Sequence, residues 1–406
     1  MKLKCPKCDY EKDVNDLVSD CPKCGLIAPH FMVNYDLEHV AKTLTKKALK
    51  KRTKDIWRYF ELFPLKYDKN LFKIRIGNTP LEQIDKLSNV LGIKNIYVKD
   101  ETLMPTLSFK DRGGIIIAAH AAQNGTKKLT VASSGNFGAA VARYCSLFGI
   151  ECIMLTADDT PKEKLAKSAM YGAKIVRVHG LYRDCRRLCI EASDNLVIHS
   201  ASWEHKPTQI EGWKTSGFEI VEQLHWNSPN IVLVPTGGGG NLLGIWKGIC
   251  EFKELGFIDS LPKMVAVQST GCSPYLEAFE KGYVKPRPFK NPKTVAKGIR
   301  SSDPFEGEYA LKAIRDSKGI VVAVTDEEIV EAGKLLASTT GILAEPSGAA
   351  SIAGAKKMKE EGIIQSDDVV VSIITGNAMN DFESYLPLVE KSHHIDPSFK
   401  EFKKII

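Results

Sequence analysis

The sequence lacks the segments that direct proteins into membranes or out of the cell. Its first residues, MKLKCPKC, contain no apolar core of the kind that secretory signal peptides carry. No apolar run approaches the roughly 18 residues that a membrane-spanning helix requires. Internal repeats and low-complexity segments are absent as well. We therefore expect a cytoplasmic protein that does not contact a membrane.

A large excess of charge of one sign is also missing. The chain has 56 Lys and Arg against 49 Asp and Glu, a formal net charge of +7. Part of the surplus lies in the basic stretch KKALKKRTK at residues 46–54. That stretch is typical of a solvated helix face, and the alternative is a patch that attracts anionic substrates or nucleic acid. It has no interleaved aromatic side chains on which bases could stack, so we expect no nucleic-acid partner.

Short β-rich apolar runs alternate with helical patterns through most of the 406 residues. Strands are expected at residues 95–101, 129–134, 151–157, 174–180, 230–235, 264–269, 319–325 and 368–375. Helices are expected between most of them, for example at 111–123 and 136–148. This alternation predicts parallel sheets covered on both faces. Because the strands are too many for one comfortable sheet, we predict an α/β protein with two parallel-sheet domains that share a cleft.

Four of the ten cysteines occur in pairs near the start of the chain. Cys5 and Cys8 form one CPKC motif, and Cys21 and Cys24 form a second after twelve intervening residues. In a chain without an export signal, this spacing indicates a metal site rather than disulfides. Four thiolates supply the closed tetrahedral shell of structural zinc, with no position left open for catalysis. We therefore predict a small N-terminal zinc ribbon, and the alternative is a hairpin without metal.

A glycine-rich turn follows the predicted strand at 230–235. Gly237, Gly238, Gly239 and Gly240 precede Asn241 and a helical pattern. Glycines before a helix N-terminus form a cradle of backbone N–H groups for an anion. The turn lacks the GK[ST] of a P-loop and an obvious acidic ribose ligand about 20 residues on. A single phosphate monoester fits it better, and the alternative is a tight turn with a structural role only.

Two further segments complete a chemical set. Ser133, Ser134, Gly135 and Asn136 follow a predicted strand and begin a helix, a turn that suits a carboxylate. In LSFKDRGG, Lys110 stands at the mouth of an apolar helix, where it is either a snorkelling surface residue or an amine held for chemistry. A lysine amine, a phosphate cradle and a carboxylate-binding turn are the parts of a pyridoxal phosphate enzyme that acts on an amino acid.

Six motifs together resemble the fold type II (tryptophan-synthase-β-like) family of pyridoxal phosphate-dependent enzymes. They are KDETLMPTLSFKDRGG, SSGNFGAA, PTGGGGN, KGIR, AEPSGAASIAG and SIITGN, and the similarity runs from about residue 57 to 381. Within this family the chain is similar to the threonine synthase group, in which zinc-ribbon-like N-termini occur. The resemblance implies a lyase of amino-acid biosynthesis that converts O-phosphohomoserine and water to threonine and phosphate. It also implies pyridoxal 5'-phosphate and structural Zn2+ as cofactors.

The resemblance also implies a domain arrangement, with the cofactor in the cleft between two α/β domains. We expect residues 1–30 to form the zinc-ribbon-like segment. Residues 31–100 and 190–390 would form a large cofactor-binding domain. Residues 101–189 would form a smaller domain that carries Lys110 and the Ser-Ser-Gly-Asn turn. A homodimer is the expected assembly.

Carried onto matching positions, the resemblance assigns a role to each motif. Lys110 would be the Schiff-base lysine and then the base that removes the Cα proton. The cradle from Gly237 to Asn241 would bind the cofactor phosphate. Asn136 would hydrogen-bond the phenolic oxygen of the cofactor ring, and Thr375 would face its pyridine nitrogen, which favours elimination and replacement over transamination. Ser133, Ser134 and Gly135 would hold the substrate carboxylate. Arg300 is a candidate ligand for a substrate anion, or else a surface arginine.

The chain departs from the threonine synthase pattern at several positions. Phe137 replaces a hydroxyl residue, Gly238 replaces an asparagine, and Trp213 replaces a glutamine. Gln209 stands where an arginine would bind the substrate phosphate, and an amide is no equivalent of a forked cation. The alternative function is therefore a threonine or serine dehydratase, or a β-replacement enzyme acting on serine or O-phosphoserine. A nucleic-acid-binding protein with a degenerate enzyme body is disfavoured because all cofactor positions are filled.

Overall fold

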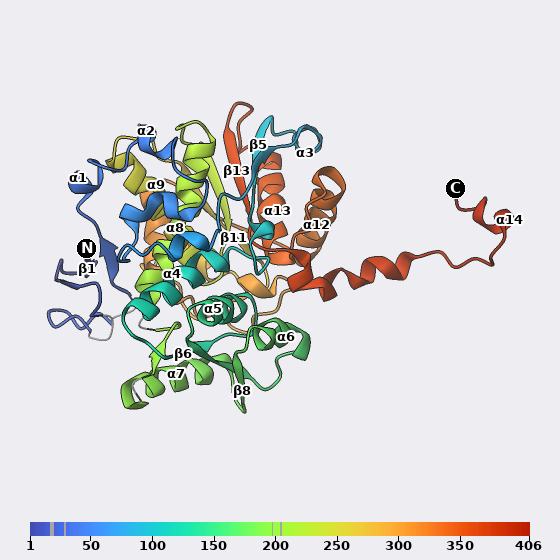
Figure 1. Cartoon of the computed structure of the whole chain (residues 1–406). Helices are drawn as coiled ribbons and strands as arrows, with labels where there is room; N and C mark the ends of the chain where they lie inside the picture. Colours follow the sequence, from blue (N-terminus) through green and yellow to red (C-terminus); the bar gives the residue numbers. More distant parts are fainter. Residues whose placement is uncertain (17–19, 28–29, 197, 204) are drawn as a thin grey trace.

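The computed structural model describes residues 1–16, 20–27, 30–196, 198–203 and 205–406 (Figure 1). The chain begins with a small antiparallel sheet in the order β2-β1-β3. Its strands are β1 (Lys2–Lys4), β2 (Glu11–Asp13) and β3 (Met32–Asn34). Leu3 and Val33 lie opposite each other in the β1–β3 pair and are both buried. This sheet therefore packs on the body of the protein.

The largest sheet has six strands in the order β12-β11-β10-β13-β5-β4. Their bounds are β4 (Leu81–Gln83), β5 (Asn95–Asp100), β10 (Ile231–Pro235), β11 (Lys263–Ser269), β12 (Val321–Val324) and β13 (Val369–Ile374). All neighbouring strands are parallel except β4, which pairs antiparallel with β5. The sequence did not predict this edge strand, because three residues are too few to show a period.

A second sheet has four parallel strands in the order β8-β7-β6-β9. They are β6 (Lys128–Ala132), β7 (Glu151–Ala157), β8 (Lys174–Val178) and β9 (His199–Ser200). Every strand expected from the sequence is therefore present, and the prediction of two parallel-sheet α/β units is confirmed. The boundaries drawn between the domains stay a prediction.

Helices cover both sheets (Figure 1). Their bounds are α1 (Leu37–Val40), α2 (Lys46–Leu49), α3 (Asp85–Leu91), α4 (Lys110–Gln123), α5 (Asn136–Leu147), α6 (Lys162–Met170), α7 (Tyr182–Leu196), α8 (Lys206–Gln223), α9 (Gly240–Glu254), α10 (Pro274–Glu280), α11 (Gly307–Asp316), α12 (Asp326–Thr340), α13 (Pro346–Glu360) and α14 (Phe399–Phe402). Short 3-10 helices are η2 (Ile56–Leu62), η3 (Leu71–Lys73), η4 (Glu101–Leu103), η5 (Lys297–Ile299), η6 (Ala378–Asn380) and η7 (Phe382–Lys391). Among the described residues no helix is long and apolar enough to cross a membrane.

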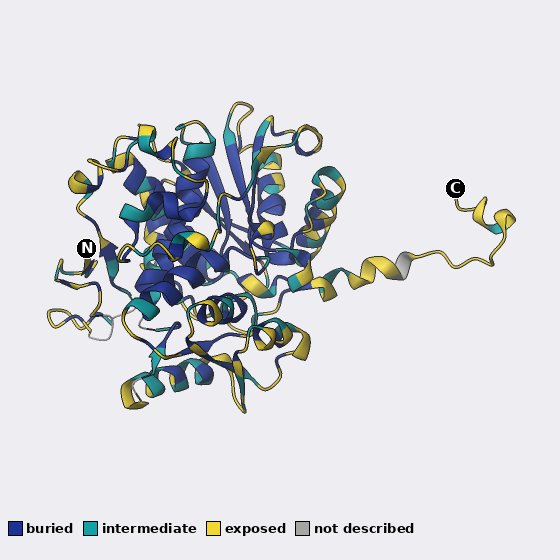
Figure 2. Ribbon diagram, in the orientation of Figure 1, coloured by how far each residue is buried: buried dark blue, intermediate teal, exposed yellow. Residues whose placement is uncertain are grey.

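The helices α4, α8 and α9 form the buried interior between the two sheets (Figure 2). Helix α8 packs on both α4 and α9, and α4 also packs on α5. A helix surrounded in this way is buried on nearly every face, and in α8 every position from Pro207 to Val221 is buried. Helices α12 and α13 lie on the other face of the six-stranded sheet. The first turns of α4, α8 and α9 bring together the motifs singled out in the sequence.

Candidate active site

The segment that carries Lys110 is attached to the end of the interior strand β13. The backbone N–H of Phe109 donates to the carbonyl of Thr375 (3.0 Å), and the N–H of Asn377 donates to the carbonyl of Leu107 (2.9 Å). Leu107 has a φ of 63°, in the left-handed region that non-glycine residues rarely adopt. The chain turns there and enters α4, whose first residue is Lys110, one position earlier than expected.

The amine of Lys110 lies against two aromatic rings. Its Nζ is 4.2 Å from the ring centroid of Phe109 and 4.7 Å from that of Trp213. Among the described residues it has no hydrogen bond or ion pair. Burial lowers the pKa of Lys110 to about 8, and the charge of Lys206 contributes in the same direction against two nearby carboxylates. About a tenth of the amine is therefore unprotonated, and nucleophilic, at pH 7, far more than for an ordinary lysine.

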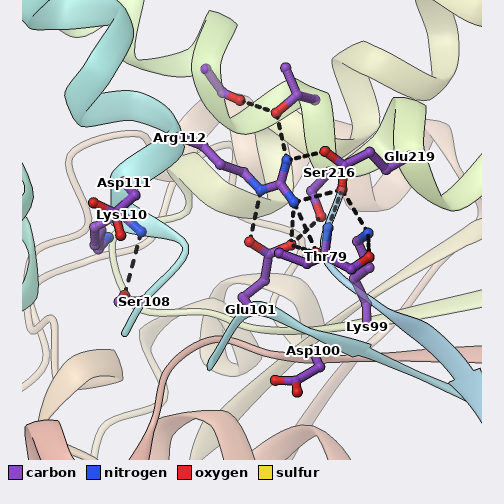
Figure 3. Close-up of polar contacts among 12 residues, drawn as sticks. Thr79, Lys99, Asp100, Glu101, Ser108, Lys110, Asp111, Arg112, Ser216 and Glu219 are labelled. Carbon is purple, nitrogen blue, oxygen red and sulfur yellow. Dashed lines mark hydrogen bonds and ion pairs between the residues drawn. The ribbon is translucent and has the colours of Figure 1, made fainter. Parts of the chain in front are cut away.

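A buried ion network lies two residues further along α4 (Figure 3). The guanidinium of Arg112 forms two-pronged contacts with Glu101 (2.7 and 2.8 Å) and with Glu219 (2.6 and 2.7 Å). Lys99 donates to Glu219 at 2.7 Å, and all four side chains are almost completely buried. Burial alone would raise the pKa of Glu219, but the charges of Arg112 and Lys99 lower it below its usual range.

This network joins three elements that are far apart in the sequence. Arg112 belongs to α4, Lys99 to β5 and Glu219 to α8, with Glu101 at the start of η4. Two cations and two carboxylates cancel in net charge, which is the condition under which buried ions are tolerated. The network therefore fixes the first turn of α4 against β5 and α8, and so fixes the backbone from which Lys110 projects.

The glycine-rich turn after β10 is crowded by its surroundings. A Cβ on Gly237 would lie 2.9 Å from backbone atoms of Ile299, and one on Gly240 would lie 2.3 Å from the Trp213 ring. Gly239 has a φ of 98° and closes against the hydroxyl of Tyr275. These positions require glycine because larger residues would collide or be strained. Trp213 thus contacts both the glycine turn and the amine of Lys110.

The same turn offers unpaired donors to an anion. Outside the helix itself, the backbone N–H groups of residues 237–241 make no hydrogen bond to the rest of the described chain. The side-chain Nδ2 of Asn241 is buried and has no partner among the described residues. These donors lie at the N-terminus of α9, a helix of 15 residues whose dipole favours negative charge there. The residues present therefore fit a phosphate group.

Asn136 and Thr375 converge on one carboxyl group. The amide Nδ2 of Asn136 donates to Glu345 (2.9 Å), and the hydroxyl of Thr375 donates to the other oxygen of the same carboxyl (3.4 Å). Burial raises the pKa of Glu345 to about 7, against the hydrogen bond from Asn136. The residues expected at the phenolic oxygen and at the pyridine nitrogen of the cofactor ring are thus brought together from α5 and the end of β13.

The turn before α5 is organised by one hydroxyl. The Oγ of Ser133 accepts from the backbone N–H groups of Gly135 (3.2 Å) and Gly138 (2.9 Å), which caps the start of the helix. Ser133 is buried, whereas Ser134 is exposed. Carboxylate binding by Ser133, Ser134 and Gly135 stays a prediction, and the hydrogen bonds give Ser133 the additional task of shaping the turn.

Arg300 and Gln209 differ in burial. Arg300 is exposed at the end of η5, and its charge lowers the pKa of Cys272 against the larger effect of burial, which raises it. Gln209 is buried on α8, with its side chain beside Gly113, one turn into α4. A role for Arg300 in binding substrate stays a prediction.

Two residues of the site had no role in the interpretation of the sequence. Glu345 lies in the motif AEPSGAASIAG, which marked the resemblance without naming a function for the carboxyl. Trp213 was noted only as a departure from the threonine synthase pattern. Both signals were visible in the sequence, but their meaning depends on contacts with Asn136, Thr375 and Lys110 that arise only in the fold.

The four N-terminal cysteines form a compact cluster. The Sγ atom of Cys5 lies 3.5 Å from that of Cys24, and the Sγ of Cys8 lies 3.6 Å from Cys5 and 3.5 Å from Cys21. All four sulfur atoms lie within 4.8 Å of one another, and none is in a disulfide. Four thiolates bound to zinc at about 2.3 Å lie about 3.7 Å apart. The cluster therefore has the dimensions of a tetrahedral thiolate site.

Comparison with known proteins bears on the whole chain. Residues 73–376 match the family described as "Pyridoxal-phosphate dependent enzyme". The threonine synthase of Methanocaldococcus jannaschii is 39% identical over 407 residues, which cover 100% of this chain and 99% of that protein. The threonine synthase of Methanosarcina acetivorans is 37% identical, over 100% of this chain and 98% of that protein.

A solved structure shares the architecture. The processed form of threonine deaminase isoform 2 from Solanum lycopersicum superposes with a TM-score of 0.68 at 25% identity, over 79% of this chain and 89% of that one. The similarity confirms the fold expected from the sequence motifs.

Proposed function

This chain belongs to the pyridoxal-phosphate-dependent enzymes, and we propose that it acts within this family as a threonine synthase. The reaction is the conversion of O-phosphohomoserine and water to threonine and phosphate. The observation that carries the proposal is the amine of Lys110, which is unpaired among the described residues and lies against the rings of Phe109 and Trp213. The Trp213 ring also contacts the glycine turn, whose N–H donors are free. Full-length similarity to two archaeal threonine synthases supports the choice of reaction.

We propose that residues 237–241 hold the cofactor phosphate and that Asn136 and Thr375 contact the ring. When bound, pyridoxal phosphate withdraws electrons from the Cα carbon of the amino acid and so makes its proton acidic. Thr375 is a neutral hydroxyl and cannot protonate a ring nitrogen strongly. This choice favours elimination and replacement reactions.

Lys110 moves the protons of the reaction in this proposal. With its pKa lowered to about 8, its amine is available to accept the Cα proton of the substrate and to return a proton later. Phe109 and Trp213 pack against the amine and restrict its position at the start of α4. Ser133, Ser134 and Gly135 are proposed to orient the substrate carboxylate, and Arg300 to attract its anionic end.

The test compares two substrates side by side. Steady-state formation of threonine and phosphate from O-phosphohomoserine should be faster than formation of 2-oxobutyrate and ammonia from threonine. Phe137, Gln209 and the architecture shared with a threonine deaminase favour the dehydratase as the second candidate. Faster turnover of threonine to 2-oxobutyrate would therefore reject the proposed reaction and leave the cofactor assignment intact.

We also propose that Cys5, Cys8, Cys21 and Cys24 bind one structural zinc ion per chain. The sulfur separations of 3.5–3.6 Å between neighbours support this proposal. Metal analysis of protein purified without chelators should give one zinc per chain, and a metal-free preparation that is equally stable would contradict it.

Size-exclusion chromatography with light scattering would test the proposed homodimer, and fractionation would test the expected cytoplasmic location.

A further inference from the structure

Lys206 opens helix α8 on the face that contacts the catalytic lysine. Trp213, seven positions later, lies against the Lys110 amine, and Gln209, three positions after Lys206, packs beside Gly113 of α4. Residues at spacings of three and seven share one face of a helix. The side of α8 that faces the start of α4 therefore carries Lys206 at its N-terminal end.

The amine of Lys206 is held beside the glycine turn. It pairs with Glu306 at 2.7 Å, with only 18% of the lysine side chain and 10% of the glutamate side chain exposed. Glu306 also donates its backbone N–H to the carbonyl of Gly238 (3.2 Å), and its carboxyl lies 3.2 Å from the position of a Cβ on Gly238. The ion pair thus borders the turn at the glycine that is least enclosed.

The position of Lys206 compensates for a missing positive charge. The buried Gln209 has a neutral amide and Arg300 is exposed, whereas Lys206 lies close enough to Lys110 for its charge to lower the pKa of that amine. A substrate phosphate carries about two negative charges near neutral pH and needs a cation when it leaves water. Lys206 is a cation on the face of α8 that contacts the start of α4.

A second cation lies on the same aromatic ring. The Lys206 Nζ lies 5.4 Å from the centroid of Phe305, and the guanidinium carbon of Arg186 lies 4.4 Å from it. Two cations around one ring give a positive region at the edge of the site. Among the described carboxylates, Glu306 is the one that occupies it by pairing with Lys206.

We propose that Lys206 binds the phosphate group of the amino-acid substrate, which displaces the carboxylate of Glu306 from the lysine amine. The inference rests on the proposed function, since it assumes a phosphorylated substrate, and it concerns recognition of the leaving group rather than the cofactor phosphate. Glu306 keeps Lys206 paired when no substrate is present. This arrangement makes Lys206 a residue that determines specificity for phosphorylated amino acids.

The experiment measures substrate preference with the cofactor-loaded enzyme. The visible absorbance of the cofactor reports the dissociation constants of O-phosphohomoserine and of homoserine, which differ only in the phosphate. Lys206→Gln should raise the dissociation constant of O-phosphohomoserine roughly ten- to a hundredfold, which is the loss expected for one charge-assisted contact. The dissociation constant of homoserine should not change. Lys206→Arg should retain most of the preference because it keeps the charge.

Two further variants separate recognition from structure. Lys164→Gln is the matched control, because Lys164 pairs with Asp381 and is 19% exposed against 8% for its partner; it should leave the preference unchanged. Glu306→Gln should tighten the binding of O-phosphohomoserine and of inorganic phosphate, because it releases the amine of Lys206 from its ion pair. If the ion pair had only a structural role, Lys206→Gln and Glu306→Gln would each weaken the binding of both O-phosphohomoserine and homoserine.

The outcomes distinguish this inference from the proposed function. Wild-type preference in Lys206→Gln, with threonine still formed from O-phosphohomoserine, would overturn the role of Lys206 alone. Loss of affinity for pyridoxal phosphate in Lys206→Gln, with an unchanged preference for the phosphorylated amino acid, would place the lysine on the cofactor and also overturn it. A wild-type enzyme that does not turn over O-phosphohomoserine would reject the proposed function itself.

Discussion

Two lysines on neighbouring elements, Lys99 fully buried and Lys110 partly buried, have opposite surroundings. Lys99 donates to the carboxylate of Glu219 at 2.7 Å, to the Thr79 carbonyl at 2.7 Å and to the Gln223 amide oxygen at 2.9 Å. Lys110 contacts two aromatic rings and has no such partner among the described residues. Burial lowers both pKa values, but at Lys99 the charge of Glu219 opposes that effect. A lysine with partners stabilises the fold, and a lysine without them is free to react.

The ion network around Arg112 lies directly beside Lys110, and this explains why one supports the fold and the other is free to react. Arg112 begins its contacts with Glu101 and Glu219 only two residues after Lys110 (Figure 3). The ion network holds the helix start rigidly, so Lys110 needs no polar contact of its own to keep its position. Its amine can therefore remain unpaired, which is the condition for nucleophilic and base catalysis.

Removing the amine of Lys110 should have the largest effect. Lys110→Ala should abolish the visible absorbance of the bound cofactor and lower kcat by roughly 10³–10⁴-fold or more, since no other amine can replace it. The free energy of unfolding should change little, because the amine makes no ion pair. Spectra, rates and urea unfolding of the same preparation provide the measurement. Wild-type turnover in this variant would show that the comparison of the two lysines is wrong.

Breaking the ion network should affect stability more than chemistry. Arg112→Met leaves Glu101 and Glu219 buried with one cation between them and should lower the free energy of unfolding by about 3–5 kcal/mol. Urea denaturation of the cofactor-free protein measures this loss. Arg52→Met is a control, because Arg52 pairs with Glu61 at 2.5 Å in a more exposed setting and should cost about 1 kcal/mol or less. Equal losses in both variants would contradict the structural role assigned to Arg112.

Glu345 extends the comparison, because it is a buried carboxyl that has no ion pair among the described residues. Its pKa is about 7 in the folded protein, against an ordinary value of 4.5 in the unfolded chain. Between these pH values the folded protein therefore binds more protons than the unfolded chain. The free energy of unfolding should therefore fall as pH rises from 4.5 to 7, by roughly 1–3 kcal/mol from this group. In Glu345→Gln this part of the fall should disappear.

Urea unfolding of wild type and Glu345→Gln at several pH values measures the difference. Cofactor-free protein is used so that ligand binding does not alter the result. The variant should be the more stable protein above pH 7 and should match wild type near pH 4.5. A difference that stays constant across this range would mean that Glu345 keeps an ordinary pKa in the fold.

Much of the site could be predicted from local sequence, and the rest could not. Short motifs predicted Lys110, the glycines 237–240 and the paired cysteines, because the residues of each motif lie close together in the sequence. The partners of Arg112 could not be predicted, because Glu219 lies 107 positions away on another helix. The same holds for Trp213, whose contact with Lys110 requires α8 to pack against α4. Distant contacts of this kind depend on how helices cross, which no local pattern records.

The sequence alone determined the strands of four or more residues, the parallel α/β architecture, the cluster of cysteines and the lysine at the head of an apolar helix. Local periodicity and turn chemistry suffice for these features, since each depends on residues within a few positions. Only the tertiary structure decided which lysine is neutralised and which is left unpaired. That decision depends on which carboxylates reach each amine, and burial makes the free-energy difference between the two environments large.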